Sequence, residues 1–351
     1  MALSAVYRCV DLISDGVAII PISVMTKDGK KVKHQLDTVF YNRNNRLTKY
    51  QFIKLLVQSV LLKGNGFAYI ERNGDGSVKS VRYLEAGDVT IMYNKMNNEL
   101  YYQCTVVANK KIEPVNMIHL VKNSYDGVNG ISVISYANNS ITNAKSTEAS
   151  ATNFFKSGCN LSGIIKVQSS LTPQQIKDIK ASWNTTYSSG NGGVSVLQGN
   201  MDYQPVQVNA NDAQLIESRH FNIGEICRFF GVSPMLLGDM TGGSQYGTLE
   251  AIQQDFVLHT LLPYIVMFEE EFTRKLLKPS ESDFKVNFDE SYLLKSDKSN
   301  EANYYSTLVE KGILSRNEAR EKLGYIPVEG GDELVIPYTN IANNTINNKQ
   351  A

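Results

Sequence analysis

The sequence contains few of the residues that bind metals or form disulfides, and they are not arranged for either task. Its 351 residues include four cysteines, without a Cys-x-x-Cys pair, and four histidines that do not cluster with them. Zinc sites usually show a Cys-x-x-Cys pair or a Cys/His cluster, and disulfide frameworks are typical of short secreted chains rich in cysteine. We therefore expect no metal site, no cofactor and no disulfide framework, and a reducing cytoplasm fits the composition.

Long hydrophobic runs and an excess of charge of one sign are also missing. No stretch approaches the roughly 18 apolar residues that a transmembrane helix needs, and the N-terminus lacks a signal peptide's basic-then-apolar order. Lys+Arg and Asp+Glu are 35 each. Proteins that bind duplex DNA tightly have a basic surface, so the zero net charge disfavours tight DNA binding. A chain with one basic and one acidic face would, however, have the same zero net charge. Contact with a membrane is not expected.

The chain lacks the common motifs of enzymes. There is no phosphate-binding loop, no dinucleotide fingerprint, no zinc-protease motif and no serine nucleophile elbow. The three successive glutamates 269–271 would point about 100° apart on a helix, so we expect a solvated or subunit-facing stretch rather than a metal site. His34, His119, His220 and His259 are isolated in the sequence, which favours core or boundary roles. The sequence therefore predicts a protein that is not an enzyme.

What the sequence does contain is the composition of a folded protein. Apolar residues make up 42%, aromatic residues 9% and charged residues 20%. These values are typical of globular chains, and the length indicates about two domains.

The first third of the chain predicts helices combined with antiparallel strands. Apolar residues recur at helical spacing over 3–20 until Pro21, where a strand begins, and a second helix is predicted from about Tyr50 to Gly64. From there to Leu120 the apolar period is two, which indicates strands, one of them over 80–93. The predicted fold class is α+β.

The rest of the chain predicts long helices around a small block. One long helix is predicted over 131–157 and a second over 211–231, and the block between them has strands at 162–168, 194–198 and 202–208 and a helix that starts at Pro173. After these comes a helical run over 248–277, which Pro263 should kink, and then a strand over 283–291. The chain ends with two short helices split at Gly312 and an Asn-rich tail that should fray.

Two of these segments indicate contacts beyond a single chain. The 131–157 helix has exposed positions that are small or amide side chains, which permit close packing of helices without burying ions. These residues are Asn138, Asn139, Ser140, Thr142, Asn143, Ser146 and Thr147. The stretch 238–247 has four glycines in ten residues, which is typical of a mobile functional loop. An ordinary helix of a monomeric bundle and a plain connection are the alternatives.

Seven stretches carry a resemblance to a known family. They are SAVYRCVDLISDGVAIIPISV, LLKGNGFAYIERNGDGSV, NGISVISYA, FFKSGCNLSGIIKV, DAQLIESRHFNIGEICRFFGVSPMLLGD, HTLLPYIVMFEEEF and KGILSRNEAREKLGYIPVEGGD. In this order and spacing, the chain resembles the HK97-type phage portal proteins over nearly its whole length. Members of that family generally have more residues before SAVYRC, and residues 1–3 would mark either a truncated chain or a short variant.

The resemblance implies a portal-type fold and names for its segments. The implied segments are an α+β wing at 1–127, stem helices at 128–158 and 211–232, a small α/β clip at 159–210, a tunnel-loop region at 233–247, a kinked long helix with a closing wing strand at 248–304, and a helical crown-like C-terminus with a frayed tail at 305–351.

The resemblance also implies a function. The chain would be one subunit of a homo-oligomeric ring, usually a dodecamer, at one vertex of the virion capsid, assembled in the cytoplasm of the bacterial host. Double-stranded DNA would pass through its channel during packaging and ejection without being read by sequence. The other implied partners are the terminase large subunit, head-completion or adaptor proteins and the major capsid protein. A monomeric head-tail adaptor and an enzyme of head maturation are the alternatives.

The implied site residues fall in three places. The tunnel loop comprises Asp239, Met240, Thr241, Gly242, Gly243, Ser244, Gln245 and Tyr246. Within it, Gln245 and Tyr246 are expected to touch the DNA backbone through steric or weak polar contacts. Pro263 would kink the helix behind the loop. On the clip helix, the terminase-facing candidates are Gln174, Gln175, Lys177, Asp178 and Lys180, for which a merely solvated face is the alternative.

Overall fold

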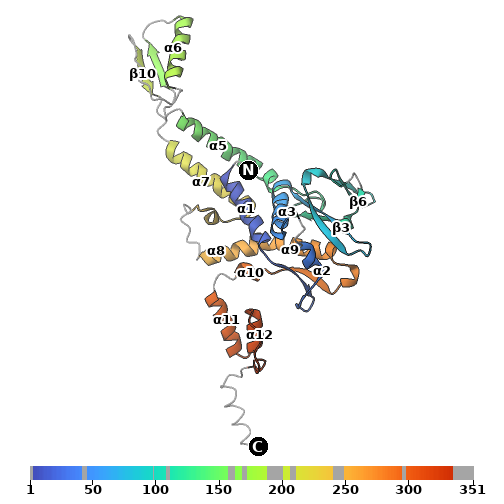
Figure 1. Ribbon diagram of the computed structural model, residues 1–351. Coiled ribbons are helices and arrows are strands. Elements are labelled where there is room, and N and C mark those ends of the chain that lie inside the picture. The colour runs from blue at the N-terminus through green and yellow to red at the C-terminus, as the bar shows by residue number, and fades with distance from the viewer. Residues whose placement is uncertain are drawn as a thin grey trace, which may run out of the picture. The chain divides into compact units, whose positions relative to one another are not determined.

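The computed structural model of the chain combines helices with small antiparallel sheets, so the predicted α+β class is confirmed (Figure 1). It describes residues 3–41, 46–97, 99–107, 111–156, 163–167, 172–187, 201–205, 211–239, 249–294 and 298–334. The chain divides into two compact units. The large unit is Met1–Phe288 and the C-terminal unit is Asp289–Ala351.

Two helices, α1 (Ser4–Ala18) and α3 (Lys49–Lys63), pack against each other and begin the core of the large unit. The buried residues of α1 recur at the predicted helical spacing and include Val6, Cys9, Val10, Ile13 and Val17. Helix α3 begins at a capping box in which Thr48 and Gln51 bond to each other's backbone. It ends at Gly64, whose φ of 87° is one that glycine adopts without strain. The predicted end of this helix is confirmed.

Two three-stranded sheets follow α3, with strand orders β4-β3-β8 and β5-β6-β7. Their elements are β3 (Asn65–Arg72), β4 (Val78–Leu84), η1 (Ala86–Asp88), β5 (Val89–Asn94), β6 (Glu99–Cys104), β7 (Lys111–Ile112), η2 (Pro114–Asn116) and β8 (Met117–Val121). The prediction of one strand over 80–93 is wrong, because the short helical turn η1 carries the chain from one sheet to the other.

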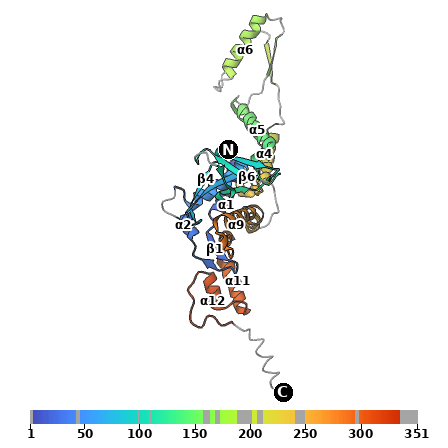
Figure 2. The same ribbon diagram turned by 90° about the vertical axis from the view of Figure 1, so that its right-hand side faces the viewer.

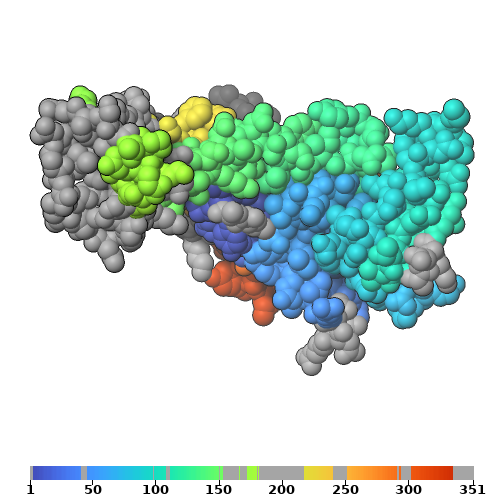
Figure 3. All heavy atoms as spheres, turned by 90° about the horizontal axis from the view of Figure 1, so that it is seen from above, coloured from blue at the N-terminus to red at the C-terminus, as the bar shows by residue number. Residues whose placement is uncertain are grey.

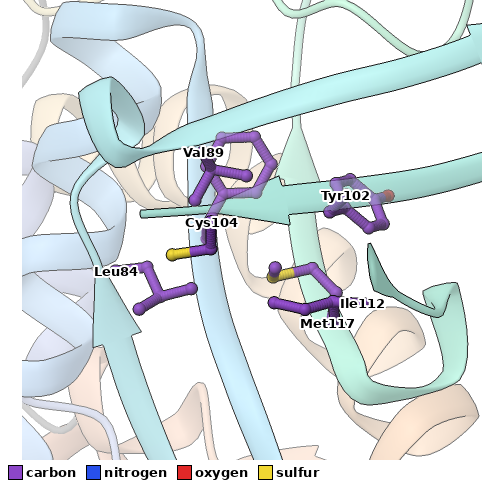
Figure 4. Packing of buried hydrophobic residues seen from close by; sticks show 7 residues of the cluster. Leu84, Val89, Tyr102, Cys104, Ile112 and Met117 are labelled. Atoms are coloured by element: carbon purple, nitrogen blue, oxygen red, sulfur yellow. The ribbon is translucent and has the colours of Figure 1, made fainter. Parts of the chain in front are cut away.

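The two sheets share one apolar cluster. Its members come from every strand of both sheets and are Phe67, Leu84, Val89, Tyr102, Cys104, Ile112 and Met117. Figure 4 shows Cys104 and Met117 pointing into the space between Leu84 and Tyr102. Burial of these side chains holds the two sheets together.

A third sheet joins the beginning of the large unit to its end. Strand β1 (Ile22–Thr26) pairs with β2 (Lys31–Val32) on one side and with β11 (Phe284–Phe288) on the other, as expected for a closing strand. Helix α9 (Leu262–Leu276) packs on β11 and β8. The ring of Phe272 stacks on Phe40, 5.6 Å away, in α2 (Gln35–Tyr41). The sequence did not predict α2.

Two long helices, α5 (Asn138–Lys156) and α7 (Asn211–Phe230), lie side by side and run in opposite directions (Figure 1). The prediction of one helix over 131–157 is wrong in detail. A separate turn, α4 (Val133–Tyr136), comes first because the Ser132 hydroxyl caps it, and the chain leaves helical geometry at Ala137.

Between these helices in sequence lies a small block in which β9 (Gly163–Val167) pairs with β10 (Met201–Pro205). Helix α6 (Pro173–Tyr187) starts after Thr172, as predicted. The strand expected at 194–198 lies outside the described residues.

After α7 the chain continues through η3 (Pro234–Leu237), α8 (Leu249–Asp255), η4 (Phe256–Leu261) and η5 (Pro279–Glu281). The C-terminal unit contains α10 (Ser291–Leu294), α11 (Lys298–Glu310) and α12 (Arg316–Lys322). Helices α11 and α12 lie side by side (Figures 1 and 2), on either side of the predicted break at Gly312.

Candidate functional site: the paired helices and the base of the loop

Helices α5 and α7 bury one narrow apolar seam. Ala144 and Ala151 of α5 and Ile226 and Phe230 of α7 are buried. Farther along the pair, the Asn222 amide donates to the Thr147 hydroxyl over 3.3 Å. The small alanines of α5 allow the two backbones to approach closely.

The outer side of α5 is exposed and carries few charges, Lys145 and Glu148 being exposed among small and amide side chains. Five of the residues predicted to be exposed are so, namely Asn138, Asn139, Thr142, Asn143 and Ser146. Ser140 and Thr147 were also predicted to be exposed, but both are half-buried. Figure 3 shows the green part of the chain, which includes α5, along one open face of the molecule.

The base of the glycine-rich loop is tied to α7. Nδ1 of His220 lies 3.2 Å from Oδ2 of Asp239, the first residue of the predicted tunnel loop. The Asp239 side chain is only 12% exposed. Gly231 and Gly238, with φ of 69° and 86°, turn the chain back toward α7 between these two residues. This contact places Asp239; Met240, Thr241, Gly242, Gly243, Ser244, Gln245 and Tyr246 lie outside the described residues.

The helix behind the loop is irregular just before Pro263. Residues Phe256–Leu261 form a π-helical turn, and Pro263 occupies the first turn of α9. Proline has no backbone N–H and its ring crowds the preceding turn, so a wider turn at this point relieves both problems. Within the π-helical turn, the Thr260 hydroxyl donates to the Gly231 carbonyl. Asp239 and Thr260, which lie before and after residues 240–246 in the sequence, are thus bonded to His220 of α7 and to Gly231 just after it.

A groove of about 620 Å³ lies between β6, β8 and α9 and is lined on one side by Pro263. Its floor holds His119, whose Nδ1 lies 3.1 Å from the Tyr102 hydroxyl and whose Nε2 lies 3.0 Å from Asn65 Oδ1. Because Asn65 Oδ1 can only accept, Nε2 carries the hydrogen. Burial, reinforced by the charges of Lys275 and Arg274, lowers the pKa of His119 to about 4. This histidine is neutral at pH 7 and has a structural role, as predicted.

The prediction that the glutamates of α9 are solvated or face another subunit is wrong for Glu271. Glu271 was expected to be solvated or to face another subunit, but it is buried and accepts from the His119 backbone N–H at 3.1 Å and from Arg274. Glu269 accepts from the Phe288 N–H at 2.7 Å. The two carboxylates serve different partners and do not converge. Within the described residues, no group of three or more His, Cys, Asp or Glu side chains is placed to hold a metal ion.

The histidines are less isolated than the sequence indicated. His34 contacts Glu281 at 3.2 Å, and His220 contacts Asp239 as described above. His259, for which a core or boundary role was predicted, has a side chain that is 76% exposed. The partners of His34 and His220 lie 247 and 19 residues away, so no local motif could reveal them.

The clip candidates lie along α6. Gln174, Gln175, Lys177 and Asp178 are exposed, whereas the Lys180 side chain lies outside the described residues. Gln175 accepts from the Thr172 N–H at 2.9 Å, and Gln174 donates to Asp178 at 3.2 Å. Gln175 therefore caps its own helix.

No helix in the described part of the chain is both long enough and apolar enough to span a membrane.

Comparison with known sequences identifies relatives over nearly the whole chain. The model of the family described as "Phage portal protein" matches residues 4–324. The portal protein of Enterobacteria phage HK97 is 26% identical, over 98% of this chain and 85% of its own length. The probable portal protein of Streptomyces phage phiC31 is 24% identical, over 94% of this chain and 76% of its own length.

Comparison with solved structures shows a shared fold. A crystal structure of an HK97-family portal protein from Corynebacterium diphtheriae matches with a TM-score of 0.66 and 15% identity, covering 84% of this chain and 95% of that one. A chain in the neck of an empty gene transfer agent particle matches with a TM-score of 0.66 and 20% identity, covering 92% and 90%.

Proposed function

The chain belongs to the phage portal protein family and is a portal subunit at a capsid vertex; on this premise we propose that about twelve copies close into a ring around the path of the DNA. The observation that carries this proposal is the family match over residues 4–324. A homo-oligomeric assembly is also the setting of the related neck structures, one of which was computed with C12 symmetry.

The low-charge side of α5 supports packing between neighbouring copies. Asn139, Asn143 and Ser146 are short or neutral, so two stems can approach without removing ions from water. Helices α5 and α7 are the stem helices of this proposal, with the wing at 1–127 outside them. The crown-like segment from residue 305 faces the capsid interior.

The loop at 239–246 narrows the channel in this proposal. The stretch from Ser233 to Gly247 contains no lysine or arginine. Each DNA phosphate that a protein neutralises increases the affinity for DNA through release of counterions. In a ring, every copy of the subunit repeats this contribution. A loop without basic residues therefore allows duplex DNA to slide. Gln245 and Tyr246 touch the backbone through weak polar or steric contacts, without reading the sequence.

The remaining assignments concern partners. The clip at 159–210 meets the terminase large subunit and later the head-completion proteins, with Gln174, Lys177, Asp178 and Lys180 on the contacting side of α6. The wing contacts the major capsid protein. Assembly takes place in the cytoplasm of the bacterial host. The protein contributes no catalysis of its own, and the partner motor supplies the energy of ATP hydrolysis.

Native mass spectrometry of the purified full chain tests the ring. We expect a closed particle of about twelve times the 39.1 kDa chain mass. A monomeric adaptor would remain at the mass of one chain until its partner is added, and that outcome would refute the ring.

The loop assignment needs a separate test. Gln245→Ala combined with Tyr246→Ala should leave the ring mass unchanged but alter DNA packaging, retention or ejection. The matched control is Met96→Ala, which should leave DNA retention unchanged, because Met96 is 99% exposed in a turn and is not one of the assigned contact residues. If the double variant packages, retains and ejects DNA as the wild type does, the loop does not contact the DNA in the proposed way.

A further inference from the structure

The C-terminal unit leaves most of its apolar side chains uncovered. Among its described residues, Ala319 is the only apolar residue that is buried. Eight large apolar residues are exposed, namely Tyr292, Tyr304, Ile313, Leu323, Tyr325, Ile326, Val328 and Leu334. Two short helices with so small a core need a further apolar surface for a stable fold.

The loop after α12, residues 323–332, is nevertheless firmly held. Its anchor is Asn317, which is itself only 7% exposed. The Asn317 amide donates to the Val328 carbonyl at 2.9 Å and to the Asp332 carboxylate at 2.8 Å, and its oxygen accepts from the Val328 N–H at 2.8 Å. The Asn317 N–H donates to the Gly331 carbonyl at 2.8 Å. Four hydrogen bonds thus fix one side of this loop.

A second anchor fixes the tip of the 323–332 loop. Arg320 Nε donates to the Ile326 carbonyl at 2.9 Å, and the Tyr325 N–H donates to the Arg320 carbonyl at 2.7 Å. The Ile326 side chain, in contrast, is 82% exposed. Because the backbone is already ordered, a partner that covers Ile326 has little conformational entropy left to overcome. The loop has the physical properties of a preformed contact surface.

The charges of this unit are arranged so that one copy complements another. Glu329, Asp332 and Glu333 give this end of the chain's C-terminal unit an acidic character. Helix α12 carries Arg316, Arg320 and Lys322 together with Glu318 and Glu321, so positive charge is in slight excess, and its two ends are basic at Arg316 and Lys322. Glu329, Asp332, Glu333, Arg316 and Lys322 are all exposed. Asp332 accepts from the Asn317 amide. The ion pairs found in the described residues include none of these five. An acidic loop that faces Arg316 and Lys322, at the two ends of α12 in a second copy, pairs these opposite charges.

We propose that the 323–332 loop of each copy packs against the C-terminal unit of the next copy, with Tyr325 and Ile326 covered by it and the acidic end of the loop facing α12. The inference rests on the proposed ring. A rotation about the ring axis leaves the height of every residue unchanged, so like units of neighbouring copies lie at one level. The contact is head-to-tail, because the 323–332 loop of one copy meets a different surface, that of α12, on the next copy.

Ile326→Asp in the full chain is the first test. We expect native mass spectrometry to find at least a tenfold smaller fraction of closed rings, with the melting of the large unit unchanged. The matched control is Met96→Asp, because Met96 is 99% exposed in a turn of the large unit. Asn317→Ala should reproduce the loss, since it releases the loop without altering the apolar side chains.

A charge exchange tests the assigned partner. One variant carries Glu329→Lys and Glu333→Lys, and the other carries Arg316→Glu and Lys322→Glu. Neither variant should close rings alone, because each places like charges at every contact. An equimolar mixture should close rings again, because alternating copies of the two variants bring opposite charges together. Failure of the mixture, or ring closure by each variant alone, would overturn the assigned contact.

The outcomes separate this inference from the proposed function. If the wild-type chain forms no ring, the proposed function fails. If the wild type forms rings and Ile326→Asp forms them equally well, the ring stands and the inference is wrong. Equal hydrogen exchange at the Val328 amide in ring and monomer would also overturn it, because a covered loop must exchange more slowly.

Discussion

Helices α3 and α12 start with the same signal but end in different surroundings. Both have a capping box, Thr48 with Gln51 in α3 and Ser315 with Glu318 in α12. Helix α3 then buries seven residues against α1 and β3, whereas the buried residues of α12 are Asn317 and Ala319. A capping signal therefore shows where a helix begins and not what its apolar side will meet.

The same contrast separates the two units. In the large unit, aromatic and aliphatic side chains from distant segments meet each other, as Phe40, Phe272 and Phe288 do. In the C-terminal unit, polar contacts of Asn317 and Arg320 hold the backbone while apolar side chains face outward. The large unit buries these side chains within one chain, whereas the described part of the C-terminal unit leaves large apolar side chains exposed.

The largest expected effect comes from the core of the large unit. Phe268 is fully buried, and its ring centroid lies 5.3 Å from Phe272 and 5.7 Å from Phe288. Phe268→Ala should lower the free energy of unfolding by about 3–5 kcal/mol, as removal of a buried aromatic ring does. Urea denaturation monitored by circular dichroism measures this loss.

The control for Phe268→Ala is an exposed aromatic residue of the C-terminal unit. Tyr304 is 61% exposed, so Tyr304→Ala should change the unfolding free energy of the monomer by less than about 0.5 kcal/mol. Equal losses from the two substitutions would show that Tyr304 belongs to a core within the single chain, and the contrast between the units would disappear.

A pH titration tests the buried state of His119 in the large unit. The pKa of His119 is lowered to about 4 by burial and by Lys275 and Arg274, whereas an unfolded histidine titrates near 6.5. Between these values the unfolded chain binds a proton that the folded chain does not. Stability from this group is therefore complete above pH 6.5 and is lost as the pH falls toward 4, by about 3 kcal/mol.

The titration is measured as the unfolding free energy of two chains. The wild type should lose more stability than His119→Gln between pH 6.5 and 4, because the variant has no imidazole to protonate. If His119→Gln has the same pH slope as the wild type, His119 is not held neutral by burial.

Two glycines with the same backbone conformation give a smaller and sharper contrast. Gly64 and Gly76 have φ of 87° and 81°. A Cβ at Gly64 would lie 2.4 Å from the Gly130 carbonyl oxygen, whereas one at Gly76 would meet nothing within 4 Å. Gly76→Ala should cost about 1 kcal/mol for the left-handed backbone alone, and Gly64→Ala clearly more. Equal melting temperatures of the two variants would contradict the close approach of the backbone at Gly130.

Local signals predicted those parts of the fold that depend on neighbours in sequence. The apolar spacing of α1, the glycine that ends α3 and the break at Gly312 are of this kind. The same pattern did not reveal α2, whose Phe40 is buried against Phe272 of α9. Such a helix is stabilised by a partner that its own sequence does not contain.

In the candidate site, too, the sequence reveals the local features but not the contacts between distant residues. The glycine-rich loop and Pro263 are visible in the sequence, where the loop follows the second long helix and Pro263 lies within the next helical run. The ties that position the loop, from His220 to Asp239 and from Thr260 to Gly231, join residues 19 and 29 positions apart. The buried state of Glu271 depends on His119, 152 positions away. A single sequence has no pattern for contacts of this range.

The smallest expected effect tests the comparison of α3 and α12 directly. Thr48→Ala and Ser315→Ala each remove a cap whose hydroxyl accepts from a backbone N–H, at 3.2 Å and 3.1 Å, so each should cost its helix about 1 kcal/mol. For Thr48 the loss should appear in the global unfolding of the large unit, since α3 is part of its core.

For Ser315, the loss should appear as local opening. In the monomer, the amides of 316–322 should exchange about fivefold faster with hydrogen, as expected for about 1 kcal/mol, while the global unfolding transition does not move. In the ring, the same substitution should have less effect on exchange, because a neighbouring copy now supports α12. A shift of the global transition by Ser315→Ala in the monomer would mean that the two units unfold together and that α12 already has its packing partner within one chain.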